Sequence, residues 1–159
     1  MATVKFHRVL VATDGSETAR VAVGVAIDLA KRYSADLLVM AVAPLPPVLS
    51  APNAPIAPVA VVESAAPYYR AIVDAAVAEA EAAGVSSVSG LCEEGVVVDE
   101  LLDGIRAHRA DLVVVGSRGL TAAKRLLLGS VSTALVTHAA CPVLVVRPAT
   151  TPPRSTDGR

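Results

Sequence analysis

The sequence predicts a doubly wound α/β domain, in which a parallel five-stranded sheet carries helices on both of its faces. Apolar runs alternate with helix-like segments along the 159 residues, in the order β-α-β-loop-α-β-α-β-α-β. The runs are continuous rather than alternating, as in strands that are buried on both faces of a parallel sheet. Right-handed crossovers between such strands distribute the connecting helices over the two faces.

The N-terminal part of the chain predicts two strands, one helix and a long loop. Residues 9–13 are an apolar run that ends at an Asp-Gly-Ser turn, and residues 16–33 form an Ala- and Val-rich segment with helical character. Residues 36–43 predict the second strand, with Leu-Leu-Val-Met-Ala-Val at its centre. Residues 44–67 hold seven of the eleven prolines, which cannot continue a helix or a sheet at that density. We therefore expect a long surface loop there.

The middle of the chain predicts a second helix, a third strand and a third helix. Residues 68–83 have helical composition, and Gly84 follows them directly, as is common after a helix. Residues 85–92 resemble a strand, so Cys92-Glu93-Glu94-Gly95 would stand at its carboxyl end. Residues 98–109 place their apolar side chains on one helical face.

The C-terminal part completes the sheet. Residues 111–116 contain the fourth strand, residues 130–139 a fourth helix, and residues 142–146 the fifth strand. We expect one domain over residues 1–147, with the proline-rich loop inside it. Residues 148–159 are polar and proline-rich, and they predict a disordered tail.

Composition excludes several classes of function. The chain carries 14 basic and 15 acidic residues, and a charge of -1 argues against nucleic acid and against an anionic membrane surface as partners. Aromatic residues make up 3% of the chain and tryptophan is absent, so platforms for stacking bases are missing. The apolar runs fall short of the ~20 residues of a membrane-spanning helix. Residues 1–8 lead into the first strand without a secretory segment, so we expect a cytoplasmic protein.

Small polar residues and glycines follow the first and fourth predicted strands. The first strand ends in Thr13-Asp14-Gly15-Ser16, and the fourth ends in Gly116-Ser117-Arg118-Gly119. Ligands of open parallel sheets bind at the carboxyl ends of the strands, where the strand order reverses. If the order is 3-2-1-4-5, these two segments are neighbours and line one crevice.

Residues 116–132 have the chemistry of a phosphate-binding segment. Glycine allows the backbone to approach a ligand closely, and Gly129-Ser130 opens a helix whose first N–H groups favour anions. Serine hydroxyls add donors, and the loop carries positive charge at Arg118, Lys124 and Arg125. The spacing is neither that of a Walker P-loop nor that of the dinucleotide fingerprint. A glycine-bearing surface loop followed by an ordinary helix start remains the alternative.

Asp14 has two possible roles, and both can hold at once. It can contact a ligand, or it can cap the helix that follows, with Glu17 three residues later as in a capping box. Ser16 is the other candidate for the cap. The histidines are scattered along the chain and indicate no catalytic histidine. The two cysteines, Cys92 and Cys141, are expected to be small buried residues without a redox role.

The sequence resembles the universal stress protein family over about residues 4–147. Four segments carry the resemblance in order: Val-Leu-Val-Ala-Thr-Asp-Gly-Ser at 9–16, Ala-Asp-Leu-Val-Val-Val-Gly-Ser-Arg-Gly at 110–119, Leu-Gly-Ser-Val-Ser at 128–132 and Cys-Pro-Val-Leu-Val-Val at 141–146. The ATP-binding branch of this family has the signature G-x2-G-x9-G-[S/T]. Gly116, Gly119, Gly129 and Ser130 match it in register.

The resemblance implies a Rossmann-like sheet of order 3-2-1-4-5, with ATP lying across strands 1 and 4 and Mg²⁺ or Mn²⁺ as the counter-ion. It implies that nucleotide-binding residues are Ala12, Thr13, Asp14, Ser16, Val42, Gly116, Ser117, Arg118, Gly119, Gly129, Ser130, Val131 and Ser132. It also implies a homodimer that pairs through the last strand, at Val143, Leu144, Val145 and Val146.

The function that follows is that of a nucleotide-dependent stress-response or signalling protein. We expect slow ATP hydrolysis at most, because no general base or activated nucleophile can be identified and efficient catalysis needs such groups. The alternatives are a true ATPase or a nucleotidyl- or phosphotransferase on the same fold, a protein that binds AMP or cyclic AMP, and an interaction module that works without nucleotide.

Overall fold

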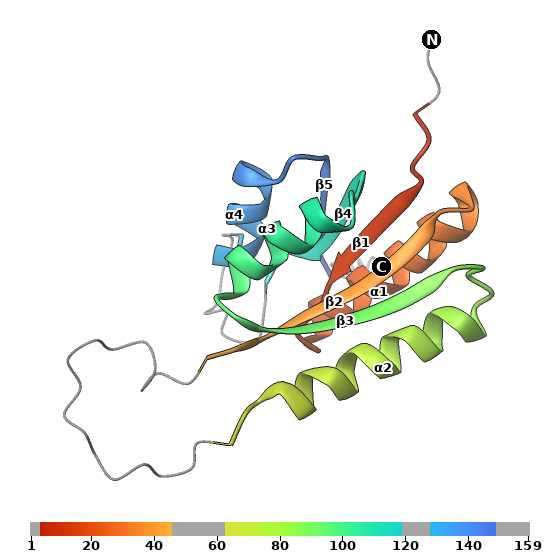
Figure 1. The fold of residues 1–159 in the computed structure, drawn as a ribbon. Coiled ribbons are helices and arrows are strands. Elements are labelled where there is room, and N and C mark those ends of the chain that lie inside the picture. The colour runs from red at the N-terminus through yellow and green to blue at the C-terminus, as the bar shows by residue number, and fades with distance from the viewer. Residues whose placement is uncertain (1–3, 46–62, 119–127, 149–159) are drawn as a thin grey trace, which may run out of the picture.

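The computed structural model describes residues 4–45, 63–118 and 128–148. Within these ranges five strands and four helices alternate along the chain (Figure 1). Their bounds are β1 (Arg8–Ala12), α1 (Glu17–Tyr33), β2 (Asp36–Pro44), α2 (Ala66–Ala82), β3 (Val88–Gly95), α3 (Val97–Ala107), β4 (Leu112–Gly116), α4 (Ser130–His138) and β5 (Val143–Val146). The strands pair in parallel in the order β3-β2-β1-β4-β5, which confirms the predicted topology.

Helices cover both faces of the sheet, as predicted. In Figure 1, α1 and α2 lie on one side of the sheet, and α3 and α4 lie on the other. Alternate residues of β1 enter the two cores, since Val9 and Val11 pack with the first pair of helices, and Leu10 and Ala12 pack with the second. Every one of these side chains is buried. The continuous apolar runs in the sequence therefore arise from burial on both faces.

The third strand differs from its prediction. It was expected over residues 85–92, and it spans Val88–Gly95. Val85 is buried, but its N–H donates to the carbonyl of Ala80 at the end of α2 rather than to a strand. Pairing with the nine-residue β2 continues until Pro44 meets Gly95, and the exposed Glu93 and Glu94 are included in the strand. An edge strand with polar residues does not give the continuous apolar run on which the prediction relied.

The proline-rich loop is shorter at both ends than predicted. Pro44 is the last residue of β2, and Pro67 lies in the first turn of α2, where a proline is tolerated because its missing N–H has no helical acceptor. Residues 46–62, which form the centre of the predicted loop, lie outside the described residues. So does the predicted tail from residue 149 onward.

Asp111 connects the start of β4 to the start of β1. Its Oδ2 accepts a hydrogen bond from the N–H of His7 at 2.8 Å, and its Oδ1 accepts one from the N–H of Arg8 at 3.0 Å. The N–H of Asp111 in turn donates to the carbonyl of Arg8 at 2.9 Å. These bonds define the register of the two central strands, and hence the relative position of their carboxyl ends.

Within the described ranges no helix is long and apolar enough to cross a membrane.

Candidate functional site

A cavity of about 620 Å³ opens at the carboxyl ends of β1 and β4, where the sequence places the site. Its volume lies within the range of small-molecule pockets, roughly 300–1,000 Å³. Ten of the predicted site residues line it, namely Ala12, Thr13, Asp14, Val42, Gly116, Arg118, Gly129, Ser130, Val131 and Ser132. Ser16 and Ser117 lie outside the lining, and Gly119 is outside the described residues.

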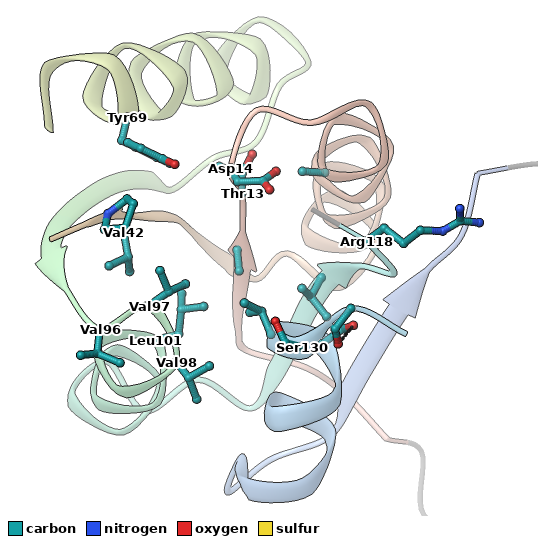
Figure 2. Close-up of a pocket in the computed structure, with 18 residues that line it drawn as sticks. Thr13, Asp14, Val42, Tyr69, Val96, Val97, Val98, Leu101, Arg118 and Ser130 are labelled. Carbon is teal, nitrogen blue, oxygen red and sulfur yellow. Dashed lines mark hydrogen bonds between the residues drawn. The ribbon is translucent and has the colours of Figure 1, made fainter. Parts of the chain in front are cut away.

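The turn between β1 and α1 settles which residue caps the helix. Ser16 is the N-cap, and its Oγ accepts a hydrogen bond from the N–H of Ala19 at 3.2 Å. Glu17 is then the first helical residue, so the expected capping box, which needs an acidic residue at the third position, does not form. The Oδ1 atom of Asp14 accepts from the N–H of Ser16 at 2.9 Å, which orients the carboxylate at the cavity (Figure 2).

Gly116 ends β4 for a packing reason that the sequence alone does not reveal. A Cβ on this residue would lie 3.0 Å from the backbone carbon of Thr18 and 3.1 Å from the backbone nitrogen of Ala19. Glycine is therefore required where the first turn of α1 crosses the end of β4. The expectation that its small size serves the approach of a ligand is incomplete, because the missing side chain would point at α1.

Ser117 and Ser132 connect the end of β4 to the start of α4. The carbonyl of Ser117 accepts from the N–H of Gly129 at 2.7 Å and from the Oγ of Ser132 at 3.3 Å. The carbonyl of Gly129 is a second acceptor at 3.0 Å, and the single hydroxyl proton of Ser132 is shared between the two carbonyls. Ser132 lines the cavity but only 2% of its surface is exposed, and its hydroxyl stabilises the connection through these bonds. Among the described atoms the Oγ of Ser117 has no hydrogen-bond partner.

The N-terminus of α4 opens onto the cavity without a side-chain cap. Gly129 is its N-cap, and no side chain accepts from the first turn of this nine-residue helix. The first N–H groups of a helix lack intrahelical acceptors, and the positive end of the helix dipole favours an anion there. Ser130 lines the cavity at this point, whereas the side chain of Arg118 extends away from it toward β5 in Figure 2. Lys124 and Arg125, the other expected cations, lie outside the described residues.

An apolar wall faces this helix N-terminus from another side of the cavity. We call it the valine wall, and it consists of Val42, Val96, Val97, Val98 and Leu101. Only Val42 was predicted. Val96, Val97 and Val98 follow β3 directly, and Leu101 lies one turn further along α3. They were missed because the strand was expected to end three residues earlier, which placed two glutamates at its carboxyl end. The general rule that ligands bind beyond strand ends would have found them with the correct strand bounds.

Tyr69, in the first turns of α2, is a further lining residue that the sequence did not indicate. Its side chain points toward Asp14 in Figure 2. Burial and the nearby Asp14 carboxylate both raise the pKa of the Tyr69 phenol, and burial contributes more. No local pattern identifies such a residue, because the packing of α2 across the sheet brings it to the cavity.

The lining has little to offer a metal ion by itself. Asp14 is the one carboxylate among the described residues that line the cavity. The described part of the chain holds no group of three or more histidine, cysteine, aspartate or glutamate side chains that could bind a metal ion. A Mg²⁺ or Mn²⁺ ion fits this donor set only as a partner of ligand phosphates, since Mg²⁺ is commonly held by one or two carboxylates together with phosphate oxygens.

Comparison with known proteins identifies the family. A model of the universal stress protein family matches residues 5–147. The chain belongs to the universal stress protein family. A universal stress protein of Thermus aquaticus is 38% identical over 144 residues, which span 89% of this chain and 99% of that protein. The resemblance seen in the sequence is thereby confirmed at the level of the family.

Solved universal stress proteins share the fold. UspA from Lactobacillus plantarum is 25% identical, with a TM-score of 0.66 over 91% of this chain and 100% of that one. A universal stress protein in complex with cyclic AMP is 28% identical, with a TM-score of 0.66 over 90% of this chain and 98% of that one. These structures place the described domain among the Rossmann-like universal stress proteins.

Proposed function

We propose that this universal stress protein binds an adenine nucleotide in the cavity and acts in a stress response through that nucleotide. One observation carries the proposal: the same cavity joins an apolar wall to the open N-terminus of α4. The valine wall suits a flat, weakly polar base, and the N–H groups at Ser130 suit phosphate oxygens. In Figure 2 the valine wall lies to the left and Ser130 to the right, as the two ends of a nucleotide require.

Two nucleotides have support from different observations. The glycine and serine pattern at Gly116, Gly129 and Ser130 matches the ATP signature of the family, and this supports ATP together with Mg²⁺ or Mn²⁺. The relative solved in complex with cyclic AMP supports a cyclic nucleotide instead. We propose ATP as the principal ligand, with cyclic AMP and AMP as the alternatives that binding must separate.

We propose binding with slow hydrolysis at most. The titratable lining residues in the described ranges are Asp14, Tyr69 and Arg118. Asp14 lies apart from Ser130, where we place the phosphates, and the phenol of Tyr69 is protonated at neutral pH, so it cannot accept a proton there. A general base must lie within hydrogen-bond reach of the attacking water, and these residues offer no dedicated group for that role.

We also propose that the protein forms a homodimer through β5. This strand closes one edge of the sheet, with β4 as its neighbour, and its sequence is Val-Leu-Val-Val. Leu144 is 38% exposed, although it is apolar and lies at the centre of an open strand edge. An apolar edge strand has unpaired backbone groups that can hydrogen-bond to another strand. We propose that β5 of a second copy is that strand.

Release and titration of nucleotide test the proposed ligand. Freshly purified protein is denatured and the released nucleotide is chromatographed, and stripped protein is titrated by calorimetry with ATP, AMP and cyclic AMP in the presence of Mg²⁺. We expect co-purified ATP or a clear preference for it. Absence of binding for all three nucleotides would refute the proposal.

Two glycine variants connect binding to the site. Gly129→Val places a branched side chain at the start of α4, where backbone angles of -62° and 162° accept any residue and the nearest atom to a Cβ is 3.4 Å away. The variant should fold and lose ATP affinity. Gly24→Val is the matched control, because a Cβ on Gly24 meets nothing within 4 Å and the residue lies outside the lining. Unchanged affinity in folded Gly129→Val would assign the nucleotide to another site.

A further inference from the structure

Tyr69 and Asp14 face one another across the cavity from different elements. Tyr69 comes from α2, and Asp14 comes from the turn after β1. In Figure 2 the phenol of Tyr69 points toward Asp14, above the opening between the valine wall and Ser130. Both residues line the cavity. The pattern of residues 116–132 on which the site was predicted includes neither α2 nor Tyr69.

Two residues of α2 near Tyr69 in the sequence, Tyr68 and Ile72, make contacts that position this part of the helix. One turn further along α2, Ile72 packs on Gly15, so closely that a Cβ on Gly15 would lie 2.7 Å from the Cδ1 of Ile72. Gly15 has φ of +79°, a conformation that favours glycine, and its missing Cβ leaves room for Ile72 against the turn that presents Asp14. The ring of Tyr68 meets the ring of Tyr69 edge-on at 5.4 Å. The phenol is therefore presented by a packed helix.

The two groups offer complementary hydrogen bonds. A phenol has an ordinary pKa of about 10, so that of Tyr69 is protonated at neutral pH and can donate one hydrogen bond and accept another. The carboxylate of Asp14 accepts hydrogen bonds, and its orientation is defined by the bond from the N–H of Ser16 to Oδ1. A ligand hydroxyl between them can donate to the carboxylate and accept from the phenol. A ligand carbon at the same place can do neither.

We propose that Tyr69 is a specificity-determining residue that, together with Asp14, recognises the ribose and selects for its 2′-hydroxyl. The inference rests on the proposed nucleotide site, in which the base lies on the valine wall and the phosphates lie at Ser130. The sugar of a nucleotide lies between its base and its phosphates, and the Tyr69–Asp14 pair occupies that intermediate position. ATP, AMP and cyclic AMP all carry a free 2′-hydroxyl, so the selection applies to each of them.

The test compares ribonucleotide and 2′-deoxynucleotide affinities in three proteins. Wild type, Tyr69→Phe and Tyr68→Phe are titrated by calorimetry with ATP and 2′-deoxy-ATP. Tyr69→Phe removes one hydroxyl and keeps the ring. Tyr68→Phe is its matched control, because Tyr68 is 58% exposed and lies outside the lining. Equal thermal midpoints for the three proteins establish that the variants are folded. If ATP proves not to be the ligand, cyclic AMP and its 2′-deoxy form replace the pair.

We expect wild type to prefer the ribonucleotide by about tenfold, and Tyr69→Phe to bind ATP about fivefold more weakly with little change for 2′-deoxy-ATP. Tyr68→Phe should behave as wild type. The inference is overturned if wild type shows no ribose preference, or if Tyr69→Phe keeps the full preference. It is also overturned if Tyr69→Phe lowers the affinities for ATP and 2′-deoxy-ATP equally, because the Tyr69 hydroxyl then contacts a part of the nucleotide that both ligands share. Failure of wild type to bind any adenine nucleotide would instead refute the proposed function itself.

Discussion

Gly116 and Gly129 belong to one sequence pattern, yet their surroundings differ. Gly116 is enclosed, because a Cβ there would meet the backbone of Thr18 and Ala19 at 3.0–3.1 Å. Gly129 has room, since its nearest neighbour, the carbonyl of Ser117, would be 3.4 Å from a Cβ. The first glycine is thus a requirement of the fold. The second is available to serve a ligand, and stability measurements can separate the two roles.

We expect Gly116→Ala to lower the free energy of unfolding by about 1–3 kcal/mol, as overpacking against backbone does. Gly129→Ala should leave it unchanged or raise it by up to about 1 kcal/mol, because the native backbone angles accept alanine and the unfolded chain loses freedom. Urea unfolding of both variants measures the difference. Equal stabilities would mean that α1 shifts away from β4 at no cost, contrary to the close packing of these two elements.

The serines of the site show where prediction at the level of single residues stops. Ser16, Ser117 and Ser132 were all predicted as nucleotide ligands. Ser16 caps α1, and Ser132 bonds to two carbonyls, so both hydroxyls have structural partners. A hydroxyl near a turn has the same sequence signature whether it satisfies backbone or ligand. Only the positions of the surrounding atoms separate the two uses.

At the scale of elements, the two edge strands of the sheet are built differently. β3 carries Ser89, Gly90, Glu93 and Glu94, and exposed charges and glycine discourage pairing at an edge. β5 carries valine and leucine only. This asymmetry supports the proposal that β5, and not β3, pairs with a second copy.

Charge at the centre of β5 should break the proposed dimer. Antiparallel pairing of two copies would place the central residues of β5 close to one another, and like charges on facing strands repel. We expect Leu144→Lys to shift the protein from dimer to monomer in light scattering coupled to size-exclusion chromatography. Val4→Lys is the control, because Val4 is 67% exposed and lies outside the strands. A dimer that persists in Leu144→Lys would locate the interface elsewhere.

β3 is the strand whose predicted ends differ most from the structure, whereas the other four strands, α1 and α4 were predicted within a residue at each end. β1, β2 and β4 were found within a residue at each end because double burial gives them unbroken apolar runs. β3 was displaced because its residues are largely exposed, and its length is determined by its partner β2. The prediction of the cavity lining succeeded and failed in the same places. Its wall of glycine and polar residues after β1 and β4 was predicted, and its wall after β3 and on α2 was not.

At the scale of the whole molecule, the raised pKa values of three side chains predict that the folded protein is more stable at acidic to neutral pH than at alkaline pH. Cys92 and Cys141 are half-buried rather than buried as predicted, yet burial still raises the pKa of both thiols. Burial and the Asp14 carboxylate raise the pKa of Tyr69. The folded protein therefore keeps these protons to a higher pH than the unfolded chain does. The stabilisation is fully present below the unfolded pKa values and is lost as the pH rises through the folded ones.

We expect the urea midpoint to fall as the pH rises above about 8.5, where free thiols begin to ionise in the unfolded chain. In the double variant Cys92→Ala, Cys141→Ala the fall should be shallower, since two of the three groups are gone. Midpoints between about pH 7 and pH 10, a range that spans the ordinary thiol and phenol pKa values, provide the comparison for both proteins. Parallel curves would show that the thiols do not contribute, and a wild-type midpoint that rises with pH would contradict the expected sign.

The hydrogen bonds of Asp111 to His7 and Arg8 have a consequence for folding during synthesis. A ribosome releases β1 before any other strand. The Asp111 carboxylate, which accepts from the N–H groups of His7 and Arg8 at the start of β1, comes 104 residues after His7. β2 can pair with β1 early, but the other side of this central strand stays open until β4 emerges. A nascent chain halted before residue 111 would expose that edge. Newly made protein should therefore depend on chaperones, or on rapid elongation, more than the stability of the finished fold suggests.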